Sequence, residues 1–409
     1  MKPGIVIFED SSFNNFLPLS YTRPVFELKC GTKSLRKRIE DMFTGFEFSF
    51  MVREVLKGVF LENNPACRVN SFEDKDTIFI NGRLLAEKSI AKIMNEENEC
   101  LFVSNGSLVA VRLNAGNKSI TSVTPENISI DYFKNLPRIE IDAEIIDYPW
   151  DIVSNNGKAI MLDWKEYEKR TQVDYSFRSV DLVNKENIYF GKNVSVMPQV
   201  VLDASHGPII IEDNVTIMSH TTILGPVFIN HDSLIKINAA IYHNTSIGEF
   251  CKVGGEVEES IIHSYSNKQH EGFLGHSYLG QWVNIGASTN NSDLKNNYGN
   301  ISVHLNNRLI DTGLQFVGLI MGDHSKTAIN TMFNTGTIVG ISCNIFGTGF
   351  PKRYIPSFTF GGVDMMRTNS IEKSIEIAKL VMSRRNITLT NAEEQLLRVV
   401  YSMTEKERN

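Results

Sequence analysis

The sequence lacks the runs and clusters that mark several large classes of protein. No apolar run approaches the ~18 residues of a membrane-spanning helix, and the first residues, MKPGIVIFEDSS, reach an acidic pair after only five apolar residues, too few for a signal peptide. No basic run suited to a phosphate backbone is present, and the 9 histidines are scattered rather than grouped as in a zinc finger. With a net charge of -6 as well, we expect a cytoplasmic protein with no nucleic-acid or membrane partner.

Cysteine is also scarce, and it is unpaired in the sequence. An odd number of widely spaced cysteines without a CxxC pair argues against a zinc or dithiol motif and predicts reduced, structural thiols. The 409 residues, 42% of them hydrophobic and 22% charged, exceed what one core organises, so we expect two domains with appendages. The five cysteines are Cys30, Cys67, Cys100, Cys251 and Cys343.

What the sequence does contain is a repeat with a period of six. A small or β-branched residue stands four places after each of the first seven aliphatic positions. Helices need apolar spacings of three and four, and free-standing strands need a spacing of two. A period of six fits a parallel β-helix with three flat faces per turn, whereas ordinary sandwich strands would need turn signals every ~8–12 residues. The aliphatic positions are Ile211, Ile217, Ile223, Ile229, Ile235, Ile241, Ile247 and Val253.

The repeat is predicted to break twice. It stops after Val253, resumes at Phe273, Leu279 and Ile285, and breaks again over residues 291–313. Polar excursions from a regular scaffold are where binding groups tend to lie. Beyond the second break two phases compete, namely Ile329, Thr335 and Ile341 against Phe333, Val339 and Ile345.

The remaining segments suggest a division into four parts: an α/β domain over 1–155, a linker helix over 156–186, the coil over 187–362 and a helical tail over 363–409. The strands GIVIF and DTIFIN and the helix SLRKRIEDMF support the first part. A second tail helix is expected to open on Asn391, with Glu394 completing a capping box. The tail is expected to cover an exposed edge of the coil.

Residues 270–289, HEGFLGHSYLGQWVNIGAST, resemble a known catalytic stretch. They match, without gaps, the H-x-x-aromatic-L-G and V-N-I-G-A-x-T pattern in the acetyltransferase domain of the bifunctional bacterial enzyme that acetylates glucosamine 1-phosphate and uridylylates the product. An Asn-Tyr pair follows in that family and is present as Asn297 and Tyr298. The resemblance implies a left-handed parallel β-helix, acetyl-CoA as cosubstrate and a homotrimer with acyl-CoA sites between subunits.

The same resemblance implies roles for individual residues. His270 would be the general base and Asn284 would orient the substrate or the base, while Asn297 and Tyr298 would hold the amino sugar. The chemistry is sensible independently, because an attacking amine must lose a proton and a neutral imidazole, of unperturbed pKa about 6.5, accepts one near neutral pH. The carbonyl oxygen gains negative charge during attack and needs fixed N–H donors, for which the candidates are Ala287 and the preceding Gly286.

The basic positions of the family are only partly kept. Lys236 stands where the family carries an arginine that contacts the sugar phosphate, and a lysine cannot form the bidentate fork. A second basic position is replaced by Gly254, for which Lys252 or Lys268 is a candidate substitute. A different amino or hydroxy sugar therefore remains an alternative acceptor.

Structural alternatives accompany each assignment. His270 could be a solvated loop residue, and Asn284 could be one rung of a stabilising ladder. His276 is a rival base and His263 a weaker one. A metal site made of these three histidines has no recognised spacing.

The first forty residues resemble, more distantly, the opening of sugar nucleotidyltransferases. LPLSYTRPVFELKCGTKSL keeps the order and spacing of that family, but FEDSSFNNF, with Glu9 and Asp10, replaces the glycine-rich phosphate loop. Val25 takes the place of the catalytic lysine, with Arg23 nearby. IFINGRLL offers Asn81 and Arg83 in place of the magnesium-binding aspartate, and without a carboxylate it would hold magnesium poorly.

The two resemblances, with the YPWDI junction at residues 148–152, span nearly the whole chain and imply bifunctional synthesis of UDP-N-acetylglucosamine. UTP would then be a further substrate, with Mg²⁺ if the front domain is active. Two alternatives stay open: a nucleotidyltransferase whose coil serves only assembly, and a non-catalytic binder of nucleotide sugars. The candidate nucleotide-binding residues are Arg23, Lys33, Asn81 and Arg83.

Overall fold

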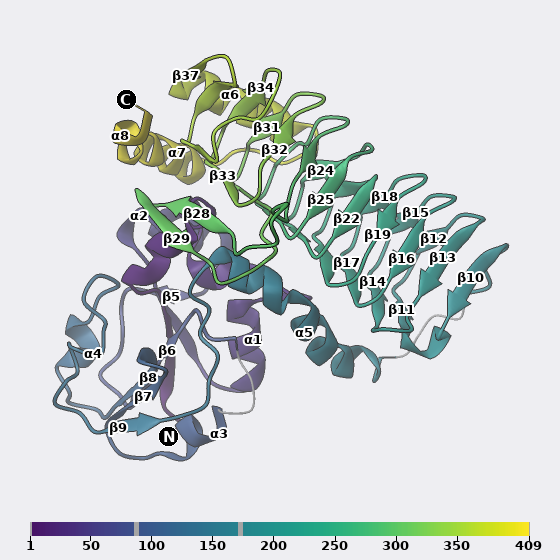
Figure 1. Ribbon diagram of the computed structural model, residues 1–409. Helices are drawn as coiled ribbons and strands as arrows, with labels where there is room; N and C mark the ends of the chain where they lie inside the picture. Colours follow the sequence, from purple (N-terminus) through teal and green to yellow (C-terminus); the bar gives the residue numbers. More distant parts are fainter. Residues whose placement is uncertain (1, 86–89, 171–174, 409) are drawn as a thin grey trace.

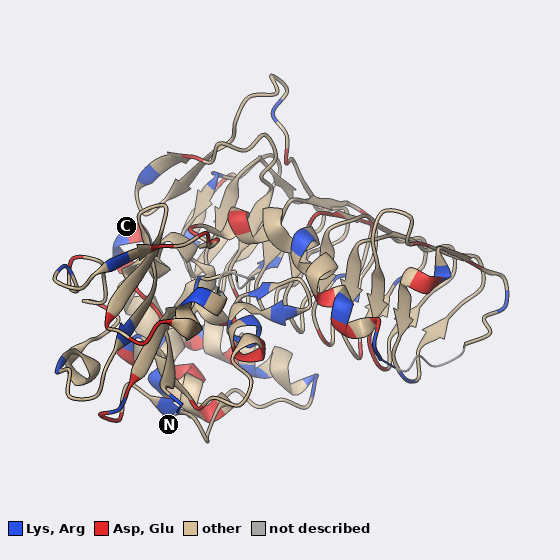
Figure 2. Ribbon diagram, turned by 90° about the horizontal axis from the view of Figure 1, so that it is seen from below, with Lys and Arg blue, Asp and Glu red and all other residues tan. Residues whose placement is uncertain are grey.

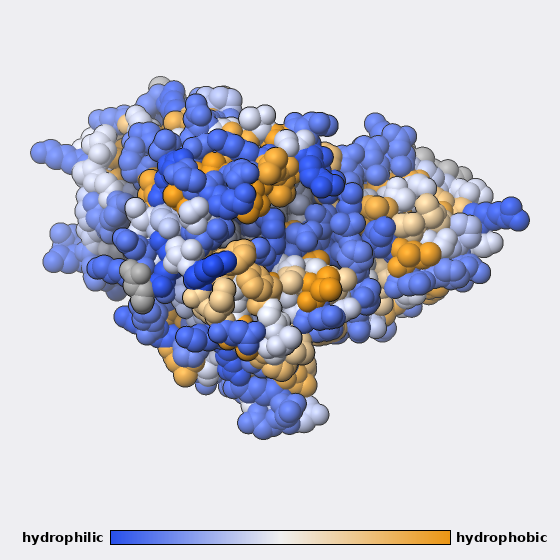
Figure 3. Space-filling model, turned by 90° about the horizontal axis from the view of Figure 1, so that it is seen from above, coloured by the Kyte–Doolittle hydropathy of each residue, from blue (hydrophilic) through white to orange (hydrophobic). Residues whose placement is uncertain are grey.

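The structure is a computed structural model that describes residues 2–85, 90–170 and 175–408. An N-terminal α/β domain lies beside a long coil of stacked strands, and the C-terminal helices lie at the last turns of the coil (Figure 1). Apolar side chains on the upper face form small groups among polar ones (Figure 3). Among the described helices, none has the length and apolar character needed to cross a membrane.

The front domain is built on a seven-stranded mixed sheet in the order β5-β4-β1-β6-β8-β7-β9. All five residues of β1 (Gly4–Phe8) and of β6 (Thr77–Asn81) are buried, as expected for central strands covered on both faces. The other strands are β4 (Phe48–Met51), β5 (Arg68–Val69), β7 (Cys100–Ser104), β8 (Ser107–Leu113) and β9 (Arg138–Glu140). The helices are α1 (Leu35–Met42), α2 (Glu54–Asn63), α3 (Ile90–Asn95) and α4 (Ser119–Ser122).

The segment after β1 runs over the carboxyl end of the sheet in short turns. It contains the 3-10 helices η1 (Ser11–Phe16), η2 (Leu19–Tyr21) and η3 (Val25–Glu27), followed by the hairpin β2 (Lys29–Cys30) and β3 (Lys33–Ser34). The predicted strands and helix of this domain are confirmed.

The coil has the three parallel faces that the repeat predicts, with the stacked sheets typical of a left-handed β-helix (Figure 1). The first face holds β10 (Val180–Val183), β13 (Val200–Asp203), β16 (Thr222–Leu224), β19 (Ala240–Ile241), β22 (Glu256–Glu258) and β25 (Phe273–Gly275), and β27 (Asn290–Asn291) pairs with β32 (Met332–Phe333) in later turns.

The second face is the longest. Its strands are β11 (Ile188–Phe190), β14 (Ile209–Ile211), β17 (Val227–Ile229), β20 (Thr245–Ile247), β23 (Ile261–Ile262), β26 (Tyr278–Leu279), β30 (Leu319–Met321), β33 (Thr337–Val339) and β35 (Tyr354–Ile355).

The third face is interrupted between two groups of strands. The first group is β12 (Ser195–Val196), β15 (Thr216–Ile217), β18 (Leu234–Ile235), β21 (Lys252–Val253) and β24 (Asn267–Lys268). The second is β31 (Lys326–Thr327), β34 (Asn344–Phe346), β36 (Thr359–Gly362) and the antiparallel β37 (Met366–Thr368).

The registers confirm the period of six. Ile211 pairs with Ile229, which pairs in turn with the residue at 247, and Ile217, Ile235 and Val253 form the matching ladder on the third face. All eight aliphatic positions are fully buried. Each turn therefore places one aliphatic side chain per face into a shared core.

The first predicted break is wrong. Residues 254–272 continue the coil through β22, β23 and β24, and their inward positions are taken by Val257, Ile262 and Lys268. The corners between these strands are shorter, so the spacing of six is lost although the coil continues. Leu274 rather than Phe273 is the inward residue of β25, because it pairs with Val257.

The second predicted break is a true excursion. It carries the antiparallel hairpin β28 (Ser302–Leu305) and β29 (Arg308–Asp311), and Val303 and Leu305 are buried in a cluster shared with the front domain. Beyond it, Phe333, Val339 and Ile345 are the inward phase, whereas Ile329 is 68% exposed.

The helix α5 (Pro149–Tyr167) joins the two domains. Its cap is local, since the Asp151 carboxylate accepts from the backbone N–H of Tyr148. The predicted boundary at 155/156 falls inside this helix, and β10 and η4 (Lys185–Asn187) already belong to the coil, while residues 171–174 of the predicted linker lie outside the described residues. Trp164 and Tyr167 pack on the second face, so α5 is part of an interface. The division into four parts remains a prediction.

The tail forms α6 (Ile371–Ser383), α7 (Asn391–Met403) and the short α8 (Glu405–Arg408). The second helix does open on Asn391, but its capping box is formed by Thr390 and Glu393, not by the predicted Glu394. The tail packs on the last turns of the coil and also against α2 of the front domain. It thus closes the space between the two domains.

Candidate active site

His270 lies on the exposed surface of the coil, at the corner that precedes β25. The Nζ of Lys268 donates to the His270 carbonyl at 2.8 Å and to the Gly254 carbonyl at 2.9 Å. On the next turn, Ser288 Oγ donates to the Glu271 carboxylate at 2.7 Å and Ser288 N–H donates to the Glu271 carbonyl at 3.1 Å. The backbone of His270 is therefore held from two sides while its imidazole stays open to solvent.

Lys268 has a different place from the one predicted. It points into the coil, is 1% exposed, and desolvation lowers its pKa to about 8. Its ammonium is engaged by backbone carbonyls and does not reach a substrate at the surface. Lys268 thus supports the corner that carries His270.

The two predicted backbone donors differ. Gly286 N–H already donates to Thr327 Oγ1 at 2.8 Å, and a Cβ on this glycine would lie 2.4 Å from the Ala328 carbonyl oxygen, so only glycine fits. Ala287 N–H has no acceptor within the described parts of the chain. Of the pair, Ala287 offers an open donor to a developing oxyanion.

Asn284 lies on the third face, in the next turn after Asn267 and before Lys326. The tail reaches this ladder, because Arg385 Nη2 donates to Asn267 Oδ1 at 3.2 Å. Arg385 was missed by sequence reasoning, since its contact spans 118 positions. The local signal is the Arg-Arg doublet that directly follows α6.

Positive charge gathers on this side of the coil. Burial lowers the pKa of Lys252, and the neighbouring charges of Arg385, Lys236 and Arg384 lower it further. Lys236 is half-buried, and a Cβ added to Gly254 would lie 2.8 Å from the Cβ of Lys236. Together these cations suit the phosphate groups of a sugar phosphate or of CoA.

Asn297 and Tyr298 are not brought to His270. Both are exposed, Tyr298 to 68%, and within the described residues no hydrogen bond, ion pair or ring contact joins either of them to His270. Their predicted role in holding the amino sugar stays a prediction.

The rival bases are constrained in ways that His270 is not. His276 lies between Asp293 and Glu259, with ring nitrogens 2.8 Å and 3.4 Å from their carboxylate oxygens. Desolvation lowers the pKa of His276, but the two carboxylates outweigh it and raise that pKa to about 9. An imidazolium cannot accept a proton. His263 is 4% exposed, on the side of the coil that faces the front domain.

In the front domain the candidate residues are paired with other protein groups. Arg23 is buried and forms an ion pair with Asp323 of the coil at 2.5 Å, while its Nη2 also donates to Gln281 Oε1 at 2.9 Å. Lys33 lies 2.7 Å from Asp41 and 2.5 Å from Glu166. Each basic side chain is thus neutralised by the protein itself.

The acidic residues after β1 are also satisfied. Glu9 forms a buried ion pair with Arg53 at 2.8 Å. Asp10 Oδ2 accepts from Asn81 Nδ2 at 3.1 Å and from Arg83 Nη2 at 2.9 Å. An arginine and an amide therefore take the carboxylate that magnesium would need, and these residues do not fit the ion.

No group of three or more His, Cys, Asp or Glu side chains in the described residues is placed to hold a metal. Acidic and basic positions are interspersed over the front domain (Figure 2). The five thiols are all free, four of them buried.

Comparison with known proteins agrees with this two-part architecture. Residues 5–172 match the family described as "Sugar nucleotidyl transferase". The chain is 26% identical over 225 residues to a "Bifunctional sugar-1-phosphate nucleotidylyltransferase/acetyltransferase" of Sulfurisphaera tokodaii, covering 54% of this chain and 55% of the relative. The chain is a distant homologue of these bifunctional transferases.

Two further similarities complete the comparison. A "Bifunctional protein GlmU" of Methanocaldococcus jannaschii is 30% identical over 126 residues, 31% of this chain and 30% of that protein. The matches thus span about half of one bifunctional relative and about a third of the other. The match to the solved structure of LpxA, a UDP-N-acetylglucosamine acyltransferase from Bacteroides fragilis, covers 57% of this chain and 84% of that chain, at 16% identity and a TM-score of 0.35.

The chain combines a sugar nucleotidyltransferase domain with a hexapeptide acyltransferase region, and it is distantly similar to the bifunctional transferases. The coil region keeps open groups at its candidate site. The nucleotidyltransferase domain keeps the fold, but its candidate phosphate-binding groups are paired internally.

Proposed function

We propose that the chain transfers the acetyl group of acetyl-CoA to the amine of an amino-sugar 1-phosphate, glucosamine 1-phosphate being the favoured acceptor. The observation that carries the proposal is the exposed imidazole of His270 one turn of the coil from the open N–H of Ala287. Acetyl-CoA is the cosubstrate. Lys236, Lys252, Arg384 and Arg385 supply charge that suits the phosphates of both substrates.

In the proposed reaction the amine nitrogen attacks the thioester carbonyl carbon. His270 accepts the proton that the nitrogen loses, and Ala287 N–H donates to the oxygen of the tetrahedral intermediate. The C–S bond then breaks, the imidazolium returns the proton to the thiolate, and the amide and free CoA leave. Lys268 keeps the His270 backbone fixed through both proton transfers, and Asn284 orients the acceptor.

The proposed site lies between subunits of a homotrimer in the cytoplasm. Ile329 directly follows Ala328, the residue that packs against Gly286, and the side chain of Ile329 is 68% exposed. Ile237 lies on the same edge of the coil and is 50% exposed. Exposed aliphatic residues beside a reactive corner suit coverage by a second copy. Asn297 and Tyr298 would then meet the sugar in the assembled protein.

For the front domain we propose a reduced role in nucleotide-sugar synthesis, in which UTP is not turned over. The internal pairing of Asp10 with Arg83 supports this role and offers no magnesium clamp. The competing function is uridylyl transfer with a purely structural coil. It predicts UTP-dependent release of pyrophosphate that does not require His270.

The decisive experiment is thiol release from acetyl-CoA with glucosamine 1-phosphate, comparing the native chain, His270→Ala and the exposed control His206→Ala. Loss of a general base should slow turnover by ~10²–10⁴, and the control should keep the native rate. Absence of thiol release from folded native protein, with or without pyrophosphate formation, would overturn the proposal.

A further inference from the structure

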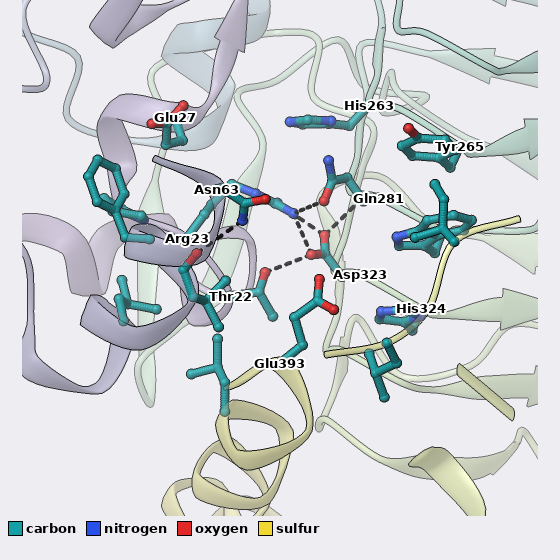
Figure 4. Close-up of a pocket in the computed structure, with 18 of the residues that line it drawn as sticks. Thr22, Arg23, Glu27, Asn63, His263, Tyr265, Gln281, Asp323, His324 and Glu393 are labelled. Carbon is teal, nitrogen blue, oxygen red and sulfur yellow. Dashed lines mark hydrogen bonds and ion pairs between the residues drawn. The ribbon is translucent and has the colours of Figure 1, made fainter. Parts of the chain in front are cut away.

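A cavity of about 490 Å³ lies where the front domain, the coil and the tail meet. Its wall combines Thr22 and Arg23 of the front domain, His263 and Gln281 of the coil, and Glu393 of α7 (Figure 4). This volume is in the range of small-molecule sites, which are ~300–1,000 Å³. No step proposed for acetyl transfer uses it.

His263 presents an unused donor to this cavity. Its Nδ1 accepts from the backbone N–H of Ser264 at 2.8 Å, and burial, with the charges of Arg23 and Lys29, lowers the pKa of His263 well below its usual value. In a neutral imidazole whose Nδ1 accepts, Nε2 carries the hydrogen. That Nε2 is buried and has no partner in the described residues.

A buried donor without an acceptor destabilises the protein, so an acceptor at this point would be favourable. His324 Nδ1, on the same wall, is also buried without a partner. Two unpartnered imidazole nitrogens on residues that line one cavity indicate a ligand with oxygen or nitrogen atoms. Structural histidines in a packed interface would instead be satisfied by protein groups.

The other residues that line the cavity indicate which chemical groups a ligand should carry. Carboxylates from Glu249 and Glu393 and the ammonium of Lys29 line the same cavity, so the wall needs donors as well as acceptors. A hydroxyl serves as both. Leu56 and Leu397 supply apolar surface, and the rings of Tyr265 and Trp282 stack at 4.3 Å.

We propose that this interdomain cavity binds a monosaccharide, with His263 Nε2–H donating to one of its oxygens. The hydroxyl rim of a pyranose matches the mixed polar wall, and its C–H faces match the leucines and aromatic rings. Because three parts of the chain close the cavity, a bound sugar stabilises their arrangement by mass action. The proposal does not depend on acetyl transfer at His270.

The test is isothermal titration calorimetry of the intact chain with glucose, N-acetylglucosamine and glucose 1-phosphate in turn. We expect saturable binding of at least one sugar and an increase in melting temperature at saturation. His263→Asn keeps an acceptor for Ser264 N–H, but its shorter side chain places no donor at the position of Nε2, so it should weaken binding at least tenfold. The surface control His206→Asn should bind as the native chain does. Tighter binding of glucose 1-phosphate than of glucose would assign the phosphate to Lys29.

Lys29→Met serves as a second variant if His263→Asn fails to fold, because its side chain is at the cavity wall and its backbone contact to Tyr278 is unaffected. It should weaken binding of the phosphorylated sugar. Absence of heat and of thermal stabilisation with all three sugars overturns the proposal. So does binding that neither variant changes, because the sugar would then lie elsewhere.

Discussion

The two candidate sites of this chain treat their charged groups in opposite ways. At the coil corner His270 is exposed, Ala287 N–H is open, and Lys236 and Lys252 have no ion pair within the described residues. At the carboxyl end of the front-domain sheet, Glu9, Asp10 and Arg83 are each bonded to a protein partner. The groups at the coil corner are therefore free to bind a substrate, whereas the charged groups of the front domain stabilise the fold.

The ion pair between Arg23 and Asp323 supports the reduced role proposed for the front domain. Arg23 is a predicted phosphate ligand, yet its partner belongs to the coil, and Thr22 Oγ1 donates to the same carboxylate at 2.6 Å. A cluster of apolar side chains, including Leu19 and Val25 from the front and Tyr278 and Ile320 from the coil, surrounds the contact. The segment that carries Thr22 and Arg23 thus forms an interdomain contact.

The strongest test of this contrast is Arg23→Ala. It leaves Asp323 buried without its cation, and breaking a buried pair in this way costs ~3–5 kcal/mol, so the denaturant midpoint should fall sharply. Lys33→Ala is the matched control, because its partner Glu166 is half exposed and such pairs contribute ~0–1 kcal/mol. Unchanged stability of Arg23→Ala with loss of UTP binding would restore Arg23 to a nucleotide site.

A second test uses the pKa of Lys268, which burial lowers from 10.5 to about 8. The unfolded chain keeps this proton up to pH ~10.5 while the folded chain releases it near 8, so stability rises with pH across that window. The expected rise is ~3 kcal/mol, and Lys268→Met should abolish that component in denaturation curves measured between pH 7 and 10.5. Lys326, whose pKa burial also lowers to about 8, would keep its own share. Identical pH profiles for both proteins would contradict a buried ammonium.

His276 should show the opposite pH dependence. Its carboxylate partners raise its pKa above the unfolded value of 6.5 to about 9, so the stability it contributes is complete below pH ~6.5 and is lost as pH rises through 9. His276→Asn should therefore cost ~2–3 kcal/mol at pH 6 and little at pH 9.5. Equal costs at both pH values would mean that the imidazole is neutral, and His276 would again rival His270 as a base.

The architecture of the coil was largely predictable, because a period of six is written in consecutive residues and fixes the register directly. The prediction from the period of six failed over residues 254–272. There Lys268 replaces an aliphatic inward residue, and shorter corners reduce the spacing between successive inward residues. A lysine is a poor signal of the core, since only the two carbonyls it meets make its burial tolerable. The capping box was misplaced by one residue because Thr390 and Asn391 both suit an N-cap.

The candidate site was predictable only where its residues are close together in the sequence. The resemblance over residues 270–289 identified His270, Gly286 and Ala287 together, and the structure separates the used N–H of Gly286 from the open one of Ala287. The pairing of Arg23 with Asp323, 300 positions apart, leaves no sequence pattern. The same holds for the cavity beside His263, which exists only once three distant segments meet.

The smallest expected effect concerns the tail at the coil site. Arg385→Gln removes one charge beside Lys252 and the hydrogen bond to Asn267, and a partly exposed charge contributes ~1 kcal/mol or less. We expect KM for acetyl-CoA to rise ~3–5-fold with kcat unchanged, and the difference to shrink in high salt because screening weakens exposed charges. Lys373→Gln, on the first turn of α6 and paired with Glu376, is the control and should leave KM unaltered. A fall in kcat with KM unaltered would instead assign Arg385 to positioning the Asn267 and Asn284 ladder, because an interaction realised only in the transition state lowers kcat rather than raising KM.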